Sequence, residues 1–252
     1  MNFYKEIEKI QARDIQAVLC IIVQTKGSTP RKTGAKMIVF EDGSIFGTIG
    51  GGNLEQQAIK QALIQLKTDE AGTFKYNLVK DLEMCCGGMV AIYYEPIKKM
   101  QKLYIFGAGH TGEALAKMAT LTDFEITLFD DRKDYLDKIE IQNAVTKHIN
   151  FEKDLQKIKP NASSYIVIMT YSHDVDRQIL ARFADEDIAY LGMIGSQRKI
   201  AVAKKFLKSK QVATHAQIES IDMPIGLDIN AKTPEEIAVS VLARLIMVRN
   251  GK

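Results

Sequence analysis

The segment from Leu103 to Arg132 constrains the fold more than any other part of the chain. It begins with a short apolar run, which is typical of a strand buried on both faces of a parallel sheet. Glycines in the G-x-G-x-x-G spacing follow, then a helical pattern, then an alternating strand that ends in acids, at Gly107, Gly109, Gly112, Asp130 and Asp131. This order predicts half of a dinucleotide-binding fold.

Each part of that segment has a role in such a fold. The first glycine permits a tight turn, the second lets the backbone approach a pyrophosphate, and the third lets the helix pack closely on the strand. The helix start offers free N–H groups to an anion, and an acid about 20 residues beyond the glycines is placed for a ribose hydroxyl. The candidate cofactor contacts are therefore Gly107, Gly109, His110, Gly112 and Asp130. A fold of this kind without a ligand is an open alternative, because fold does not imply function.

Length and composition indicate a soluble protein with two domains. The chain has 252 residues, of which 26% are charged and 46% hydrophobic. A net charge of +3 over the whole chain makes no basic patch, which argues against a nucleic-acid partner. The N-terminus lacks the apolar core of a signal peptide, and the longest apolar run, Ala17 to Val23, is too short to span a bilayer. We expect a cytoplasmic protein without membrane contact.

A polar linker at Pro96 to Lys102 divides the chain. We expect an N-terminal domain over residues 1–97 and a C-terminal domain over residues 102–252. The patterns predict an α/β fold, with a mixed sheet in the first domain and a Rossmann-like, doubly wound parallel sheet in the second. In the second domain they predict a helix and further strands at 151–158, 165–170, 188–194 and 224–229.

The first domain carries another glycine-rich turn. Gly50 to Gly52 follow a predicted hairpin and lead into a helix for which Asn53 is a good N-cap. Because consecutive glycines are costly in backbone entropy, they suggest that an anion approaches the backbone closely. A tight connection without a ligand explains the pattern equally well. Arg31, on the loop before the hairpin, can pair with a phosphate in bidentate fashion, although a lone loop arginine is more often solvated.

The three cysteines form neither a disulfide framework nor a C-x-x-C zinc motif. Cys20 lies in an apolar run and is predicted to be a core residue. Cys85 and Cys86 stand directly before Gly87 and Gly88 on a predicted loop. A thiolate there can ligate a soft metal or carry a persulfide sulfur. The alternative is a buried cysteine pair of no chemical consequence.

Polar residues also follow the later strands of the second domain. His173 lies just after a predicted strand, at the sheet edge that faces the ligand crevice, so it is a candidate for acid-base work. A helix that starts at Asp174 beside an incidental histidine is at least as good an explanation. Ser196 can cap the next helix, and Arg198 with Lys199 can hold an anion there.

Taken together, these landmarks resemble the xanthine dehydrogenase accessory factor family, of the XdhC/CoxI type. The motifs that carry the resemblance span nearly the whole chain in order: GSTPRKTGAKM, GTIGGGNLEQQ, CCGG followed by MVAIYYEP, IFGAGHTGEAL, LFDDR, YLGMIGSQRK, PIGLDI and TPEEIAVSVLA. The resemblance implies an N-terminal α/β domain joined to a C-terminal Rossmann domain.

The resemblance also implies a function. Members of the family act in the cytoplasm as maturation factors for molybdenum hydroxylases. They bind molybdenum cofactor (molybdopterin), protect it while its terminal sulfur is installed, and deliver it to the apo-enzyme. The implied partners are an apo molybdenum hydroxylase of the xanthine dehydrogenase type and a cysteine desulfurase, and the implied assembly is a homodimer.

Position by position, the resemblance adds weight to residues of both domains. They are Arg31, Gly50, Gly51, Gly52, Glu55 and Cys86 in the first, and Gly107, Gly109, Gly112, Asp130, His173, Ser196 and Arg198 in the second. It favours the ligand role of Cys86, because family members usually carry one cysteine before the Gly-Gly pair, and Cys85 is then the extra one. The chain departs from the family pattern at Arg244, where an acid is more usual.

The leading hypothesis is a carrier more than a catalyst. A pyranopterin phosphate would contact the glycine-rich backbone and Arg31, and Cys86 would lie near the molybdenum or the incoming sulfur. The Rossmann crevice would hold a nucleotide portion or a regulatory ligand. If the protein is an enzyme, the alternative is an NAD(P)-dependent oxidoreductase with His173 as its acid or base. A third hypothesis is a nucleotide-sensing binding protein without chemistry.

Overall fold

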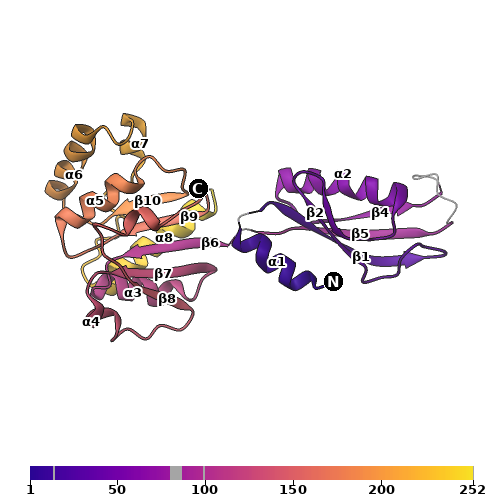
Figure 1. Cartoon of the computed structure of the whole chain (residues 1–252), viewed down its shortest axis with the longest axis horizontal. Helices are drawn as coiled ribbons and strands as arrows, with labels where there is room; N and C mark the ends of the chain where they lie inside the picture. The colour runs from indigo at the N-terminus through magenta and orange to yellow at the C-terminus, as the bar shows by residue number, and fades with distance from the viewer. Residues whose placement is uncertain (14, 80–86, 99, 252) are drawn as a thin grey trace. The chain divides into compact units, whose positions relative to one another are not determined.

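The chain forms two compact units, Met1–Lys99 and Met100–Lys252, in a computed structural model that describes residues 1–13, 15–79, 87–98 and 100–251. Each unit has its own sheet and its own hydrophobic core (Figure 1). The first unit is α/β and the second is Rossmann-like, which confirms the predicted fold class, except that the first sheet, predicted as mixed, has only antiparallel pairs among its described strands. Within the described ranges, no helix is both long and apolar enough to cross a membrane.

The first unit is a five-stranded antiparallel sheet with a helix on each face (Figure 1). The strand order is β3-β2-β1-β5-β4, and the elements are α1 Phe3–Ala12, β1 Ala17–Lys26, β2 Lys36–Phe40, β3 Ile45–Gly47, α2 Gly52–Thr68, β4 Gly72–Asn77 and β5 Met89–Pro96. Helix α2 packs Leu54, Ala58 and Ala62 against one face, and α1 packs Ile10 against the other. Apolar residues on both faces of the sheet are therefore covered.

The start of α2 differs from the prediction. Its N-cap is Gly51, so the expectation that Asn53 caps the helix is wrong. Gly50, Gly51 and Gly52 have φ of +137°, +78° and +62°, a conformation that favours glycine. The chain can therefore turn into the helix earlier than a capping asparagine would allow.

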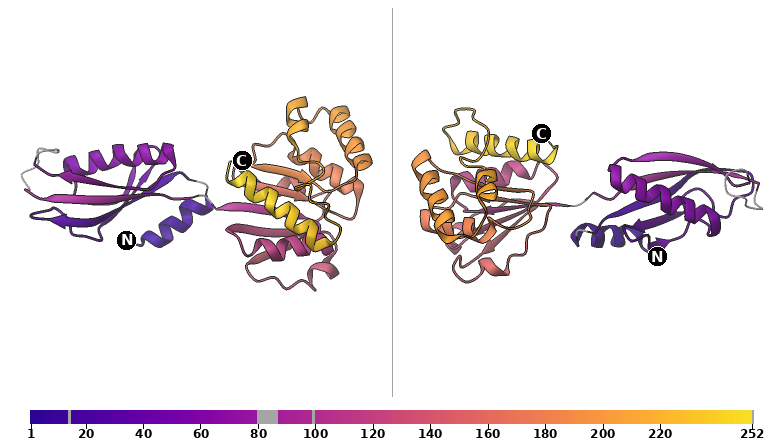
Figure 2. Two further views of the ribbon diagram at one scale, coloured as in Figure 1. Left: turned by 180° about the vertical axis from the view of Figure 1, so that it is seen from behind. Right: turned by 90° about the horizontal axis from the view of Figure 1, so that it is seen from above.

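The second unit is a five-stranded parallel sheet with helices on both faces. The strand order is β10-β9-β6-β7-β8, with β6 Gln101–Phe106, β7 Phe124–Asp130, β8 Ala144–His148, β9 Ser164–Ile168 and β10 Tyr190–Met193. The helices are α3 His110–Ala119, α4 Lys133–Leu136, α5 His173–Phe183, α6 Gln197–Lys210, α7 His215–Ser220 and α8 Pro234–Arg249. Helix α3 and helix α8, of which α8 is yellow in Figure 2, cover one face, and α5, α6 and α7 cover the other.

The segment 224–229 is not a strand, so that prediction is wrong. Pro224 has no N–H to donate to a sheet, and Gly226 has φ of +96°, outside the extended region. The segment nevertheless lies beside β10, because the Ile225 N–H donates to the Met193 carbonyl at 3.1 Å.

The predicted helix at 151–158 is reduced to a 3-10 turn at Leu155–Lys157. Just before it, the Asn150 side chain accepts the N–H groups of Glu152 and Lys153, at 3.0 and 3.1 Å. Such local side-chain bonds offer the backbone an alternative to a helix, and here they replace its first turn.

The glycines after β6 have different reasons to be glycine. A Cβ on Gly107 would lie 2.4 Å from the Met169 carbonyl oxygen, and one on Gly112 would lie 1.8 Å from the Gly107 carbonyl oxygen. The first and third glycines are therefore required by packing within the protein. A Cβ on Gly109 would meet no atom of a described residue within 4 Å, so the described structure leaves the space beside this residue open.

A buried carboxylate holds the glycine turn in place. Asp130 is 1% exposed, and its Oδ2 accepts the Ala108 N–H at 2.6 Å. The Arg132 guanidinium donates to both oxygens at 2.8 Å, and the Arg132 N–H donates to Oδ1 at 2.9 Å. Burial alone raises the pKa of Asp130, but the hydrogen bonds from Arg132 and Ala108 outweigh it and lower the pKa below its ordinary value.

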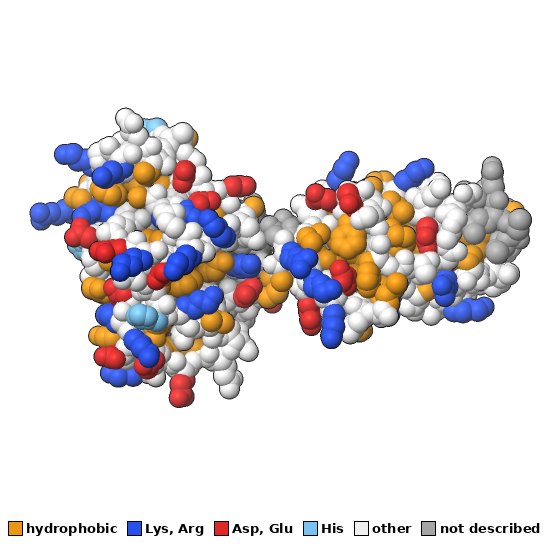
Figure 3. All heavy atoms as spheres, viewed as in Figure 1, with side chains coloured by type: hydrophobic (Ala, Val, Ile, Leu, Met, Phe, Trp, Pro, Cys, Tyr) orange, Lys and Arg blue, Asp and Glu red, His pale blue; other side chains and the backbone are white. Residues whose placement is uncertain are grey.

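Charged side chains of both signs are interspersed on the face drawn in Figure 3. This mixture agrees with the small net charge of +3. The absence of a nucleic-acid partner stays a prediction.

Gly112→Ala should destabilise the second unit, because the new methyl group would overlap the Gly107 carbonyl oxygen. We expect the free energy of unfolding to fall by about 3 kcal/mol, the upper part of the range for overpacking, as measured by urea denaturation. Gly109→Ala is the matched control, since its Cβ enters open space at φ of −69°. Gly109→Ala should lower the free energy of unfolding by less than about 1 kcal/mol. Equal losses of stability in the two variants would contradict the packing role of Gly112.

Asp130→Asn should lower stability in a pH-dependent way. Because the folded pKa of Asp130 lies below the unfolded value of about 4, its carboxylate stabilises the fold above that pH and ceases to do so as the pH falls through the folded value. In thermal melting, the free energy of unfolding of the variant should be about 3 kcal/mol lower than that of the wild-type protein at pH 7. This difference should become smaller below about pH 4. A difference that is constant from pH 3 to pH 7 would show that the ion pair is not its cause.

Candidate functional site

Four loops meet at the carboxyl edge of the parallel sheet. They follow β6, β7, β9 and β10, and the strand order reverses between β6 and β9, which are neighbours. In open α/β sheets, ligands bind outside the carboxyl ends of the strands at such a switch point. The structure brings eight predicted residues to this edge: Gly107, Gly109, His110, Gly112, Asp130, His173, Ser196 and Arg198.

The turn after β6 leaves room for an anion. Gly109 is the N-cap of α3, and no side chain hydrogen bond caps this helix start within the described part of the chain. His110 is the first helical residue and is exposed. The open space at Gly109 and the first N–H groups of α3 together suit a phosphate oxygen.

The two acids after β7 have different environments. Both oxygens of Asp130 already accept hydrogen bonds, and whether it also receives a ribose hydroxyl stays a prediction. Asp131 Oδ2 accepts the Tyr171 hydroxyl at 2.9 Å, but its buried Oδ1 has no partner among the residues that the structure describes. Because buried polar atoms are rarely unsatisfied, Asp131 joins the candidates. From the sequence, Asp131 was noted only as the acid that follows Asp130, the predicted ligand contact.

An aromatic and cationic stack lies beside these acids. The Arg132 guanidinium carbon lies 4.0 Å from the ring centroid of Tyr135 and 4.4 Å from that of Tyr171. The two tyrosines are 47% and 58% exposed, so ring surface remains for a ligand to stack on. The hydrogen bond to Asp131 raises the pKa of the Tyr171 hydroxyl. The stack was not predicted, because its members come from two segments that are far apart in the sequence.

A buried ion pair joins α5 and α6, the helices that follow β9 and β10. Asp176 is fully buried, and its Oδ1 accepts the N–H and the hydroxyl of Thr170 at 3.1 and 2.6 Å. Its Oδ2 pairs with the Lys199 ammonium group. Lys199 is thus engaged inside the protein, whereas Arg198 beside it is exposed. No local pattern signals this pair, because its partners lie on different helices.

His173 and Ser196 occupy helix starts. His173 is the first residue of α5 and is exposed, and no side chain in the described ranges makes a hydrogen bond or ion pair with it. The N-cap of α5 is Ser172, so the helix does not start at Asp174. Ser196 caps α6 as predicted, accepting the Lys199 N–H at 3.4 Å. The acid-base role of His173 stays a prediction, with no orienting partner in this structure.

The three-glycine loop of the first unit encloses a carboxylate. Glu55 Oε1 accepts the Thr48 hydroxyl and the backbone N–H groups of Ile49, Gly50 and Gly51, the last three at 3.1, 3.2 and 2.8 Å. Partial burial raises the pKa of Glu55, but these hydrogen bonds outweigh it and lower the pKa below its ordinary value. The backbone N–H groups of this loop were predicted to bind a ligand anion, but they donate instead to the Glu55 side chain of the same unit.

Arg31 lines a small pocket next to this loop. The pocket has a volume of about 270 Å³, and it is also lined by Met1, Phe3, Gly34, Ala35, Lys36, Gly47 and Thr48. Arg31 is exposed, and its guanidinium pairs with no described side chain, whereas its backbone carbonyl accepts the Thr29 hydroxyl at 2.9 Å. A guanidinium and an ammonium group in one small pocket suit an anionic ligand group.

The cysteine predictions divide between described and undescribed residues. Cys85 and Cys86 lie outside the described residues, so the metal and sulfur roles of Cys86 stay predictions. Cys20 is buried in the first core, where burial raises its pKa to about 12, as suits an unreactive thiol. Among the residues with described positions, no group of three or more His, Cys, Asp or Glu side chains is arranged to hold a metal ion.

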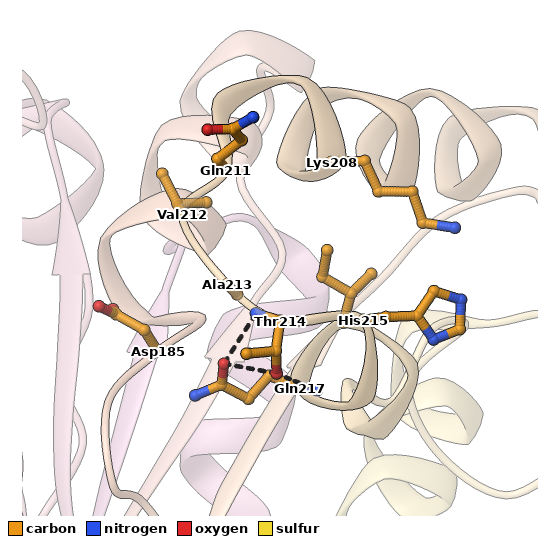
Figure 4. Close-up of a pocket in the computed structure, with 9 residues that line it drawn as sticks. Asp185, Lys208, Gln211, Val212, Ala213, Thr214, His215 and Gln217 are labelled. Carbon is orange, nitrogen blue, oxygen red and sulfur yellow. Dashed lines mark hydrogen bonds between the residues drawn. The ribbon is translucent and has the colours of Figure 1, made fainter.

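A larger pocket of about 490 Å³ lies at the turn between α6 and α7 (Figure 4). Lys208 and His215 project beside it, and Val212 adds apolar surface. The side chains of Thr214 and Gln217 form a capping box at the start of α7. None of the predicted site residues lines this pocket, which lies at the end of α6 remote from the carboxyl edge.

Comparison with known proteins gives relatives along the whole chain. YqeB of Escherichia coli (strain K12) is 31% identical over 257 residues, which cover 100% of this chain and 47% of YqeB, so the chain spans about half the length of that relative. A protein of Bacillus subtilis (strain 168) that is named as a probable xanthine dehydrogenase subunit is 23% identical, over 98% of each chain. The molybdenum cofactor insertion chaperone PaoD of Escherichia coli (strain K12) is 22% identical, over 92% of this chain and 83% of PaoD.

Among solved structures, a crystal structure of a xanthine dehydrogenase from Bacillus halodurans has the same fold, with a TM-score of 0.54 and 21% identity over 100% of this chain and 97% of the other. Two family models match the sequence itself. The XdhC Rossmann domain matches residues 103–245, which is more than half of the chain, and the XdhC and CoxI family model matches residues 10–77. The order of motifs, the two units and these matches agree, and the chain belongs to the XdhC and CoxI family.

Proposed function

We propose that this protein binds molybdenum cofactor and serves in the maturation of a molybdenum hydroxylase of the xanthine dehydrogenase type. The observation that carries the proposal is the similarity to PaoD, because it extends over 92% of this chain. PaoD is named as a molybdenum cofactor insertion chaperone, and the relative from Bacillus subtilis is named for a xanthine dehydrogenase. The role of the chain is then to hold the cofactor, aid its sulfuration and pass it on.

The residues of the first unit fit one end of such a cofactor. Molybdenum cofactor is a pterin with a phosphate group, and when bound it supplies the molybdenum that the hydroxylase needs. Arg31 and Lys36 line a pocket of about 270 Å³, and the Arg31 guanidinium pairs with no described side chain. We assign these two cations to the phosphate. Cys86 is assigned to the molybdenum or to the sulfur that is installed on it.

The second unit fits a nucleotide portion or a regulatory ligand. Its crevice offers the open space at Gly109, the uncapped start of α3 and exposed ring surface on Tyr135 and Tyr171. A phosphate at the glycine turn and a base on the tyrosines are thus the contacts we assign there. Sulfur supply by a cysteine desulfurase, a homodimeric assembly and a cytoplasmic location are further parts of the proposal.

An NAD(P)-dependent oxidoreductase is the rival function. Its support is the glycine fingerprint, but the acid of that fingerprint, Asp130, already binds Ala108 and Arg132. Its only proposed acid or base, His173, is exposed and without an orienting partner in the described structure. Turnover of NAD(P)H by the purified protein would favour this rival over a carrier.

Cys86→Ala should prevent sulfuration of the hydroxylase, whereas Cys85→Ala is the matched control and should not. We expect the hydroxylase purified from cells with the Cys86 variant to lose cyanide-releasable sulfur and activity by at least about tenfold, the scale on which groups near a metal act. The accessory protein itself should be purified from the same cells and tested for bound pterin by fluorescence after oxidation. No pterin in the wild-type protein, together with unchanged sulfuration in the Cys86 variant, would refute the proposal.

Gly109→Ala should weaken nucleotide binding to the second unit, because its methyl group would fill the space assigned to a phosphate. Calorimetric titration with AMP, GMP and CMP should show a loss of affinity of about tenfold, or 1.4 kcal/mol, for whichever nucleotide the wild-type protein binds. The stability of the variant, tested above, separates this loss from misfolding. Equal affinity in the variant and the wild-type protein would remove the glycine turn from the site.

A further inference from the structure

The carboxylate of Glu55 is used on one side only. All the hydrogen bonds that the described residues donate to it, from Thr48, Ile49, Gly50 and Gly51, end at Oε1. None of these donors reaches Oε2, and Glu55 is only partly buried. An ionised carboxylate oxygen has about two lone-pair sites. Among the described residues, no donor occupies Oε2, so this oxygen can accept hydrogen bonds from a ligand.

This arrangement reverses the charge expected at the three-glycine loop. The N–H groups of Ile49, Gly50 and Gly51, which would attract a phosphate, already hold a negative charge. Burial raises the pKa of Glu55, but the hydrogen bonds lower it further than burial raises it, so the group is ionised at neutral pH. A phosphate on this loop would meet a like charge, whereas N–H donors would meet a free acceptor.

The backbone next to Glu55 leaves room for such a ligand group. A Cβ on Gly51 or Gly52 would meet no atom of a described residue within 4 Å, so packing among the described residues does not require glycine at either position. Gly50 is different, because its Cβ would lie 2.7 Å from the Pro30 Cβ. The open space is therefore confined to the two glycines at the start of α2, where a flat ring can approach the bare backbone.

The neighbouring pocket supplies the opposite charge. Thr48 connects the Glu55 carboxylate with the pocket. Its hydroxyl donates to Glu55, and Thr48 lines the pocket together with Arg31 and Lys36. The first unit thus presents two cations and a carboxylate oxygen that no described donor occupies, all next to Thr48. A ligand that carries N–H donors at one end and an anionic group at the other is complementary to this pair of features.

We propose that Glu55 Oε2 accepts hydrogen bonds from the amino and amide N–H groups of a pterin ring, while Arg31 pairs with the phosphate of the same molecule. This inference rests on the proposed binding of molybdenum cofactor and states which edge of its ring the first unit reads. A carboxylate at that edge also rejects rings that present acceptors there, because two facing acceptors repel each other and leave both unpaired. Glu55 is then a specificity residue for the ring.

Fluorescence titration of the full-length protein with free pterin and calorimetric titration with inorganic phosphate test the inference. Glu55→Gln keeps the shape of the side chain, and its amide oxygen can still accept the loop N–H groups, which places the amide N–H2 where Oε2 was. The variant should therefore bind pterin at least about tenfold more weakly, the scale of a hydrogen bond to a charged group. It should bind phosphate as well as the wild-type protein, or more tightly.

Two variants control this experiment. Glu41→Gln removes the same charge from an exposed position in the same unit and should leave both affinities unchanged. Arg31→Gln should weaken phosphate binding and leave the affinity for free pterin unchanged, because free pterin carries no phosphate. Thermal melting of each variant, compared with the wild-type protein, separates a lost contact from a lost fold.

The outcomes distinguish this inference from the function on which it rests. Pterin binding by the wild-type protein that is unchanged or strengthened in Glu55→Gln would overturn the role of Glu55 and leave cofactor binding in place. Weaker phosphate binding in Glu55→Gln would also overturn it, because it would make the loop an anion site. No pterin binding by the wild-type protein would overturn both the inference and the proposed cofactor.

Discussion

Hydrogen bonds from loop N–H groups to carboxylates of the same chain hold the glycine turns of both units. In the second unit Asp130 accepts the Ala108 N–H at 2.6 Å and so ties the turn after β6 to the end of β7. Arg132 neutralises this buried charge and is itself fixed by it, between the rings of Tyr135 and Tyr171. The open space at Gly109 and the aromatic stack thus depend on one buried carboxylate.

The same arrangement recurs where the chain must hold an irregular loop. Glu55 gathers the donors of the three-glycine loop, and Asp176 gathers those of Thr170 while it pairs with Lys199. A glycine-rich backbone has N–H donors but little intrinsic order. An internal carboxylate orders the loop by accepting hydrogen bonds from these N–H groups, which are then not available to a ligand. A glycine-rich loop in this protein is therefore not automatically an anion site. What remains for ligands is the space and charge that the internal carboxylates leave unused.

Sequence reasoning found the local features and missed the long-range ones. Periodicity predicted both sheets, because apolar alternation is a property of neighbouring residues. It failed at 224–229, where an apolar run is interrupted by Gly226 with positive φ. The N-cap preference of asparagine wrongly predicted Asn53 as the cap of α2. The carboxylate that organises this turn lies further into the helix, at Glu55. The pairing of Asp176 with Lys199 depends on how two helices pack, which no local pattern encodes.

The electrostatics of the described sites favour holding a ligand over reacting with it. A general acid or base works best with a pKa near the working pH, but the pKa values of Glu55 and Asp130 are both lowered, which keeps these groups ionised at neutral pH. Fixed anions of this kind, which accept hydrogen bonds from loop N–H groups, are suited to orient a ligand or the loop around it. The Arg31 guanidinium and the His173 ring, which pair with no described side chain, belong to exposed residues. A cofactor bound as proposed, by fixed anions and exposed groups, would be released to a partner without first breaking a buried network.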